Sequence, residues 1–137
     1  MVNQLANFNW ISVSIAFIVY FVLGALWFTV FFPKPYRKSL GKEHETLPNK
    51  PIFIAGPALC ALVITIASAW LIYALNISSV MEAVQFSLLV GIGYLFANTV
   101  NIAINPNIPR PILYGIISGV YHLTGILIVS MIIIIMK

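Results

Sequence analysis

Polar side chains recur at helical spacing inside one of the apolar stretches of this chain. The series consists of Ser87, Gly91, Tyr94, Asn98, Asn101 and Asn105. Its steps of four, three, four, three and four residues follow one face of an α-helix. A bare amide in hydrocarbon costs several kcal/mol. We therefore expect this face to contact other helices or water, where its amides and hydroxyl groups would bind a polar ligand.

A single histidine, His122, lies near the middle of the next apolar stretch. The face that it shares, about a third of the helix circumference, contains Gly115, Ser118, Gly119 and Gly125. In an antiparallel hairpin centred near residue 108, Tyr94 lies at the depth of His122, and Asn98 lies at the depth of Ser118. A neutral imidazole needs both a donor and an acceptor. Tyr94 or Asn98 is therefore expected to be a partner of His122.

Two interpretations of these polar residues remain open. An ionisable residue in the middle of a membrane helix indicates a ligand or proton site by default. The alternative is a hydrogen-bonded contact between two helices, which contributes about 0.6 kcal/mol. The candidates for a ligand site or polar pocket are Tyr94, Asn98, Asn101, Ser118 and His122.

The remaining reactive side chains do not form a catalytic set. There is no carboxylate pair, no metal-ligand cluster and no nucleophile with an adjacent base, so we expect neither an enzyme nor a cofactor or metal site. Cys60 is the only cysteine and lies inside an apolar stretch, which predicts a packing role. His44 with its two glutamate neighbours is interpreted as a solvated charge cluster. No partner nucleic acid is expected.

The composition indicates the environment that these residues occupy. The chain of 137 residues is 61% hydrophobic and only 7% charged, whereas a soluble domain is about 25% charged. In lipid the backbone must satisfy its own hydrogen bonds, which leaves helices or closed barrels. The apolar stretches do not alternate as barrel strands do. The sequence therefore predicts an all-α fold in the lipid bilayer.

Four stretches are long enough to cross about 30 Å of hydrocarbon, which needs about 20 helical residues. They cover residues 8–32, 52–75, 80–104 and 112–136. Little chain is left outside them, so residues 1–137 are expected to form one transmembrane domain, an antiparallel four-helix bundle. The short connections 76–79 and 105–111 predict that the spans they join are neighbours. Close helix packing is expected at Gly24, Gly115, Gly119 and Gly125.

The positive charges predict the orientation. Six of the seven Lys and Arg residues lie in the loop 33–51 or at Arg110, and only Lys137 lies at the other side. By the positive-inside rule the loop is cytoplasmic and both termini are on the outer side. The same residues could contact anionic lipid headgroups, or they could serve only as a topology signal. The headgroup candidates are Lys34, Arg37, Lys38, Lys42 and Arg110.

Short motifs along the chain resemble an uncharacterised bacterial membrane family, catalogued as domain of unknown function 1761. They are Asn9-Trp10, the segment 24–28 that closes the first span, Leu40-Gly41 in the basic loop, and the segment 119–122. The resemblance covers nearly the whole chain and implies a four-helix protein of the bacterial inner membrane. It brings no established activity, cofactor or catalytic residue. The asparagine series is not attributed to the family pattern.

Two classes of function are compatible with the sequence. The first is a small binding or transport module that works as a homo-oligomer around the polar face, because four helices enclose little volume. The second is a structural or accessory subunit of a larger membrane complex, without a ligand of its own. Small four-helix multidrug exporters are disfavoured, since the first span has no acidic residue to couple protons.

Overall fold

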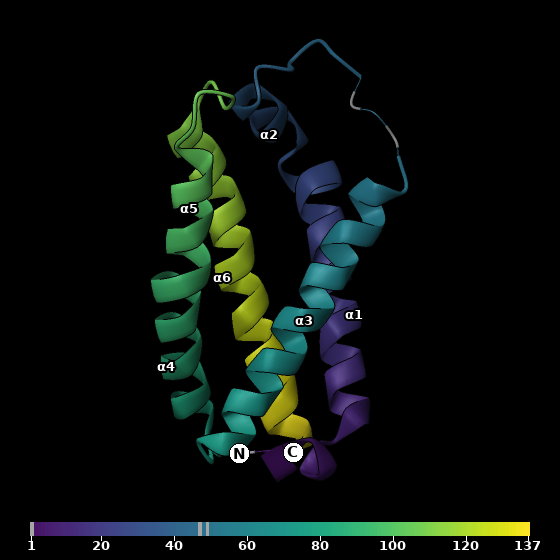
Figure 1. Cartoon of the computed structure of the whole chain (residues 1–137), viewed down its shortest axis with the longest axis vertical. Helices are drawn as coiled ribbons and strands as arrows, with labels where there is room; N and C mark the ends of the chain where they lie inside the picture. Colours follow the sequence, from purple (N-terminus) through teal and green to yellow (C-terminus); the bar gives the residue numbers. More distant parts are fainter. Residues whose placement is uncertain (1, 47, 49) are drawn as a thin grey trace.

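The computed structural model describes residues 2–46, 48 and 50–137. Four helices are long and apolar enough to cross a membrane, and they cover Trp10–Phe31, Ile52–Ala74, Val80–Ala103 and Pro111–Met136 (Figure 1). These bounds lie within two residues of the predicted spans. The prediction of an all-α fold with four transmembrane helices is confirmed, and the protein is a multi-pass membrane protein.

Two of the spans contain a π-helical segment. The first consists of α1 (Trp10–Leu26) and η2 (Trp27–Phe31), and the third consists of α4 (Val80–Val90), η3 (Gly91–Phe96) and α5 (Ala97–Ala103). The second and fourth spans are the α-helices α3 (Ile52–Ala74) and α6 (Pro111–Met136). Two short elements lie outside the spans, the 3-10 helix η1 (Val2–Asn7) and the α-helix α2 (Pro33–Ser39).

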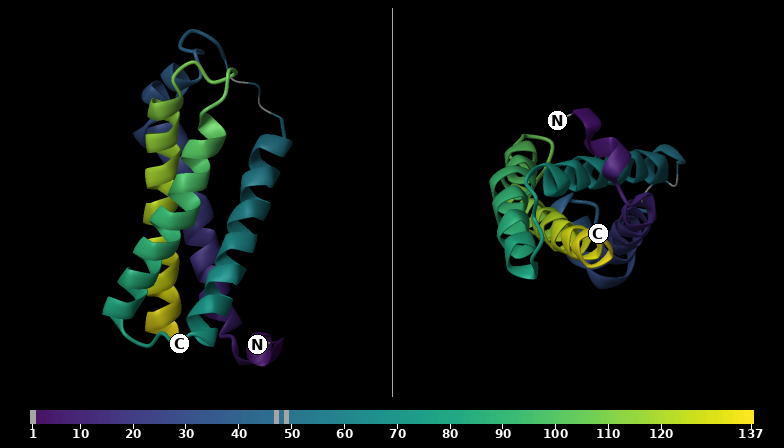
Figure 2. Two further views of the ribbon diagram at one scale, coloured as in Figure 1. Left: turned by 60° about the vertical axis from the view of Figure 1, so that its left-hand side comes forward. Right: turned by 90° about the horizontal axis from the view of Figure 1, so that it is seen from below.

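Helix α6 is the central element of the bundle. It contacts α1, α3, the whole third span and α2, and Figures 1 and 2 show it between α1 and the third span. We expected the second and third spans to pack side by side, because only a short turn joins them. That prediction is wrong: α3 packs against α1 and α6, and α4 packs against α6 and η3.

Both ends of the chain lie at the same end of the bundle, which we call the terminal end (Figure 1). Asn9 caps α1 by accepting hydrogen bonds from the backbone N–H groups of Ile11 and Ser12. Its side-chain amide also donates to the carbonyl of Met136 at 2.7 Å. The Tyr73 hydroxyl accepts from the backbone N–H of Asn9 at 3.1 Å. One asparagine therefore joins α1, α3 and α6.

Glycines allow close approach of α6 to its neighbours. A Cβ at Gly119 would lie 2.5 Å from Cδ2 of the Phe96 ring, and one at Gly115 would lie 3.0 Å from Cγ2 of Val100. Gly125 faces the ring of Tyr20 on α1 at even closer range. On α1, a Cβ at Gly24 would lie 2.7 Å from the Tyr121 hydroxyl. All four glycines that we predicted as packing positions face a large side chain of another helix.

Replacing Gly119 by leucine is therefore expected to destabilise the bundle by about 1–3 kcal/mol, because the Phe96 ring must move to admit the new side chain. Thermal unfolding in mild detergent measures this. Gly56→Leu is the matched control, since a Cβ there meets nothing within 4 Å. Equal stability of the two variants would contradict the packing that we describe.

Candidate functional site

The central polar contact of the bundle joins α1 to α6. The Tyr20 hydroxyl and Nδ1 of His122 are 2.6 Å apart and share a hydrogen bond. In one neutral tautomer the hydroxyl donates to Nδ1, and in the other Nδ1–H donates to the hydroxyl oxygen. Tyr20 is fully buried, and its ring stacks on that of Tyr121 with 5.3 Å between centroids. The imidazole is therefore positioned by a tyrosine from the first span.

Tyr94 and Asn98 do not contact His122. The Tyr94 side chain is 71% exposed, and Asn98 and Asn101 are also exposed on the surface of the bundle. The predicted pairing of His122 with Tyr94 or Asn98 is wrong, and so is the expectation that this face points towards the other helices. The structure separates the five predicted pocket residues into two groups, with Ser118 and His122 on α6 and the other three outside.

The π-helical segment η3 explains this difference. A π turn contains an extra residue, which rotates the face that follows by roughly 100° relative to an unbroken α-helix. Ser87 and Gly91 are buried before the segment. After it, the residues that face the glycines of α6 are Phe96 and Val100. The step from Gly91 to Phe96 is five residues, so the inward face no longer includes Tyr94 and Asn98.

The other polar residues of the series have local roles. The Ser87 hydroxyl is buried and donates to the carbonyl of Ala83 at 2.7 Å. Asn105 closes the turn before α6, since its side-chain oxygen accepts from the backbone N–H of Asn107 at 2.8 Å. Ser118 is buried one turn before His122, and its hydroxyl has no hydrogen-bond partner among the described residues.

An open groove lies on the outer side of the third span. Gly93, Tyr94, Leu95, Ala97, Asn98 and Asn101 line it. The middle of the span is near residue 92, so a rise of 1.5 Å per residue places Asn98 about 10 Å from the midplane. The hydrocarbon core extends about 15 Å to each side. The Asn98 amide is therefore on the outside of the monomer at hydrocarbon depth.

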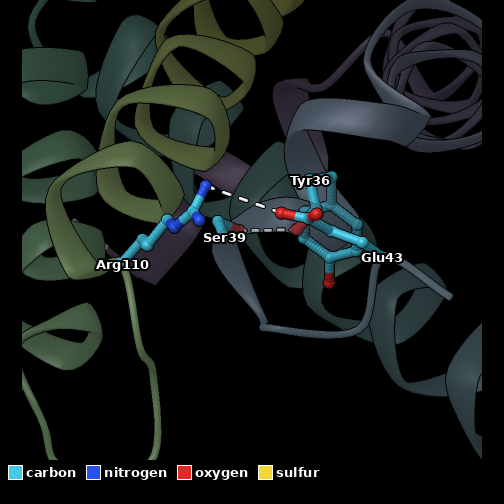
Figure 3. A network of polar contacts seen from close by, with 4 residues as sticks. All are labelled: Tyr36, Ser39, Glu43 and Arg110. Carbon is cyan, nitrogen blue, oxygen red and sulfur yellow. Dashed lines mark hydrogen bonds and ion pairs between the residues drawn. The ribbon is translucent and has the colours of Figure 1, made fainter. Parts of the chain in front are cut away.

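A second polar cluster lies at the end of the bundle opposite the termini, which we call the loop end (Figure 3). Arg110 forms an ion pair with Glu43 at 3.5 Å, and its backbone N–H donates to the carbonyl of Ser39 at 3.2 Å. The Ser39 hydroxyl donates to the carbonyl of Tyr36 at 2.6 Å. Burial, followed by the neighbouring Tyr114, raises the pKa of Tyr36 to about 12. These contacts hold α2 against the start of α6.

The predicted headgroup residues differ in their surroundings at this end. Lys34, Arg37 and Lys38 line one cavity, whereas Lys42 lies 3.9 Å from the Glu45 carboxylate. Arg110 is engaged by Glu43, as described above. The loop end therefore combines two compensated cations with three that share a cavity.

Comparison with known proteins follows from this geometry. The family model described as "Protein of unknown function (DUF1761)" matches residues 11–134, which is nearly the whole chain. The chain belongs to this family. The resemblance inferred from the short motifs is confirmed. No curated protein and no solved structure matches the chain.

The match to DUF1761 begins after Asn9 and ends before Met136, and it includes Tyr20, the whole third span and His122. Across the described part of the chain, no three His, Cys, Asp or Glu side chains lie close enough to hold a metal ion. The chemistry that the Tyr20–His122 pair offers is hydrogen bonding and proton exchange.

Sequence reasoning missed Tyr20, although a signal for it was present. Tyr20 lies near the middle of the first span and His122 lies near the middle of the fourth. The depth argument that selected Tyr94 applies equally to Tyr20. Because Tyr20 is the hydroxyl that faces α6, the partner of His122 comes from the first span.

A double-mutant cycle of Tyr20→Phe and His122→Phe is expected to give a coupling energy of about 0.6 kcal/mol and at most about 1.7 kcal/mol, because one interhelical hydrogen bond is removed. Unfolding in detergent or bicelles measures it. The control cycle of Tyr94→Phe and His122→Phe should give no coupling. Coupling in the control and none in the first cycle would restore the partner that the sequence predicted.

Proposed function

We propose that this member of DUF1761 is a binding or transport module for small polar solutes that works as a homo-oligomer. The observation that supports it is the exposed Asn98 amide on the outer face of the monomer at hydrocarbon depth. An amide facing lipid there is destabilising by several kcal/mol. A neighbouring copy or a hydrated path along the groove removes that penalty.

The chemistry of this face suits a second copy of the chain. Asparagine has both donor and acceptor groups, so identical amides related by a two-fold axis can bind each other. Gly93 and Ala97 are small residues in the same groove, and nothing lies within 4 Å of a Cβ added at Gly93. Small residues allow the backbones of two membrane helices to approach closely.

The interior of one copy favours a path between copies. Between α1 and α6 the space is filled by aromatic rings, with Tyr121 in contact with Tyr20 and 5.3 Å from the centroid of Phe28. Solute would instead contact the hydroxyl of Tyr94 and the amides of Asn98 and Asn101 in the outer groove. These three residues remain ligand candidates, whereas His122 supports the scaffold from inside.

Asn98→Cys in a Cys60→Ala background is expected to form a disulfide-linked dimer in native membranes, because the two-fold axis brings the two positions together. Non-reducing electrophoresis after mild oxidation measures it. Val63→Cys on α3 is the control, since Val63 is 58% exposed on another span and should stay monomeric. A link from Asn98→Cys to a different protein would support an accessory subunit instead, and a monomer would contradict both.

We further propose that the loop end is cytoplasmic and that the protein lies in a bacterial inner membrane. The support is the distribution of Lys and Arg, with six of seven at the loop end. A cell surface reached by both termini then carries the turn between α3 and α4.

Labelling with a membrane-impermeant maleimide tests this orientation in the Cys60→Ala background. Ser78→Cys should be labelled in spheroplasts, and His44→Cys should be labelled only after the membrane is permeabilised. Both positions are exposed, and neither substitution removes a positive charge. Labelling of His44→Cys from outside would reverse the orientation.

A further inference from the structure

A cavity of about 720 Å³ lies where the first span ends and α2 begins. Lys34, Arg37 and Lys38 line it, together with Thr29, Glu43 and two prolines. The three cations occupy positions i, i+3 and i+4 of one short helix, so they lie on the same side of α2. This arrangement concentrates positive charge around one space.

The carboxylates of the chain leave these three cations uncompensated. The sequence has three acidic residues. Glu43 lies 3.5 Å from Arg110, Glu45 lies 3.9 Å from Lys42, and Glu82 caps α4 at the terminal end. Within the described residues, Lys34, Arg37 and Lys38 therefore have no carboxylate within ion-pair distance. A negatively charged ligand would supply the missing charge.

The side chain of Tyr36 fixes α2 in position before any ligand binds. Its ring contacts Phe28 of the first span, with 4.7 Å between centroids, and Tyr114 of α6, with 5.8 Å. The hydrogen bond from the Arg110 backbone to Ser39 holds the end of the same helix. The cations are thus presented by a helix that is packed on two spans, which lowers the ordering cost of binding.

The depth of the cavity indicates the source of the anion. Only Phe32 separates the last residue of the membrane span, Phe31, from the start of α2. Lys34 and Arg37 therefore lie at the level of the lipid headgroups. Arginine binds phosphate with paired hydrogen bonds, and lysine binds it as a point charge. The nearby Glu43 carboxylate can accept a hydrogen bond from a headgroup hydroxyl.

We propose that this cavity is a phosphate site occupied by the headgroup of an anionic glycerophospholipid, such as phosphatidylglycerol. The bound lipid links α2 to the end of the first span. Lys42 and Arg110, which have carboxylate partners, take no part in the site. The proposal does not depend on the oligomer proposed above.

Native mass spectrometry of the delipidated full-length protein in neutral detergent tests the site by titration with phosphatidylglycerol, phosphatidylcholine or inorganic phosphate. Phosphatidylglycerol should bind most tightly. Arg37→Gln should weaken its binding about tenfold, because a hydrogen bond to a charged group contributes about 1.5–3 kcal/mol. Lys42→Gln, which removes the same charge from the same loop, should bind like the parent protein.

Each other outcome would overturn the proposal. Equal binding of the two lipids would exclude an anion site, and equal weakening by Arg37→Gln and Lys42→Gln would indicate diffuse attraction by the whole loop. Binding of inorganic phosphate as tight as that of the lipid would exclude a lipid as the source. Lys38→Gln is a second variant in the same cavity and should behave like Arg37→Gln. If Lys38→Gln binds phosphatidylglycerol like the parent protein, the assignment of the cavity is wrong.

Discussion

Close packing of the other helices on the small residues of α6 is the constraint on which the rest of this structure depends. Hydrocarbon provides no hydrophobic driving force between membrane helices, so contact area and short backbone distances must hold them together. Gly119 receives the Phe96 ring and Gly125 receives the Tyr20 ring. The same approach that buries Tyr20 brings its hydroxyl to His122. The polar contact is therefore a consequence of glycine packing.

The overall architecture could be predicted from the sequence because it depends on average properties. Long apolar stretches must be helices in lipid, and their lengths fix the spans to within two residues. The neighbours of each span could not be predicted in the same way. The short turn 76–79 joins α3 to α4, yet the packing on α6 separates them, because contact area along a whole helix outweighs the proximity that a turn imposes at one end.

The orientation of the polar face could not be predicted, because the argument assumed 3.6 residues per turn throughout the third span. One π-helical segment breaks that assumption, and Asn98 then lies outside while Ser87 stays inside. Gly91 and Gly93 flank the change of register, and glycine in a helix interior is destabilising. Those two residues were the only local signal, and a pair of glycines in a membrane helix is too frequent to indicate a π turn.

Side-chain ¹⁵N NMR of His122 tests the central claim most directly, namely that its partner is Tyr20 because η3 turns the third span outwards. Only His44 and His122 contribute imidazole signals, so the assignment needs a single His44→Gln variant. Tyr20→Phe should shift the Nδ1 resonance of His122, whereas Tyr94→Phe and Asn98→Ala should leave it unchanged. A shift caused by Tyr94→Phe or Asn98→Ala, with none from Tyr20→Phe, would contradict the account.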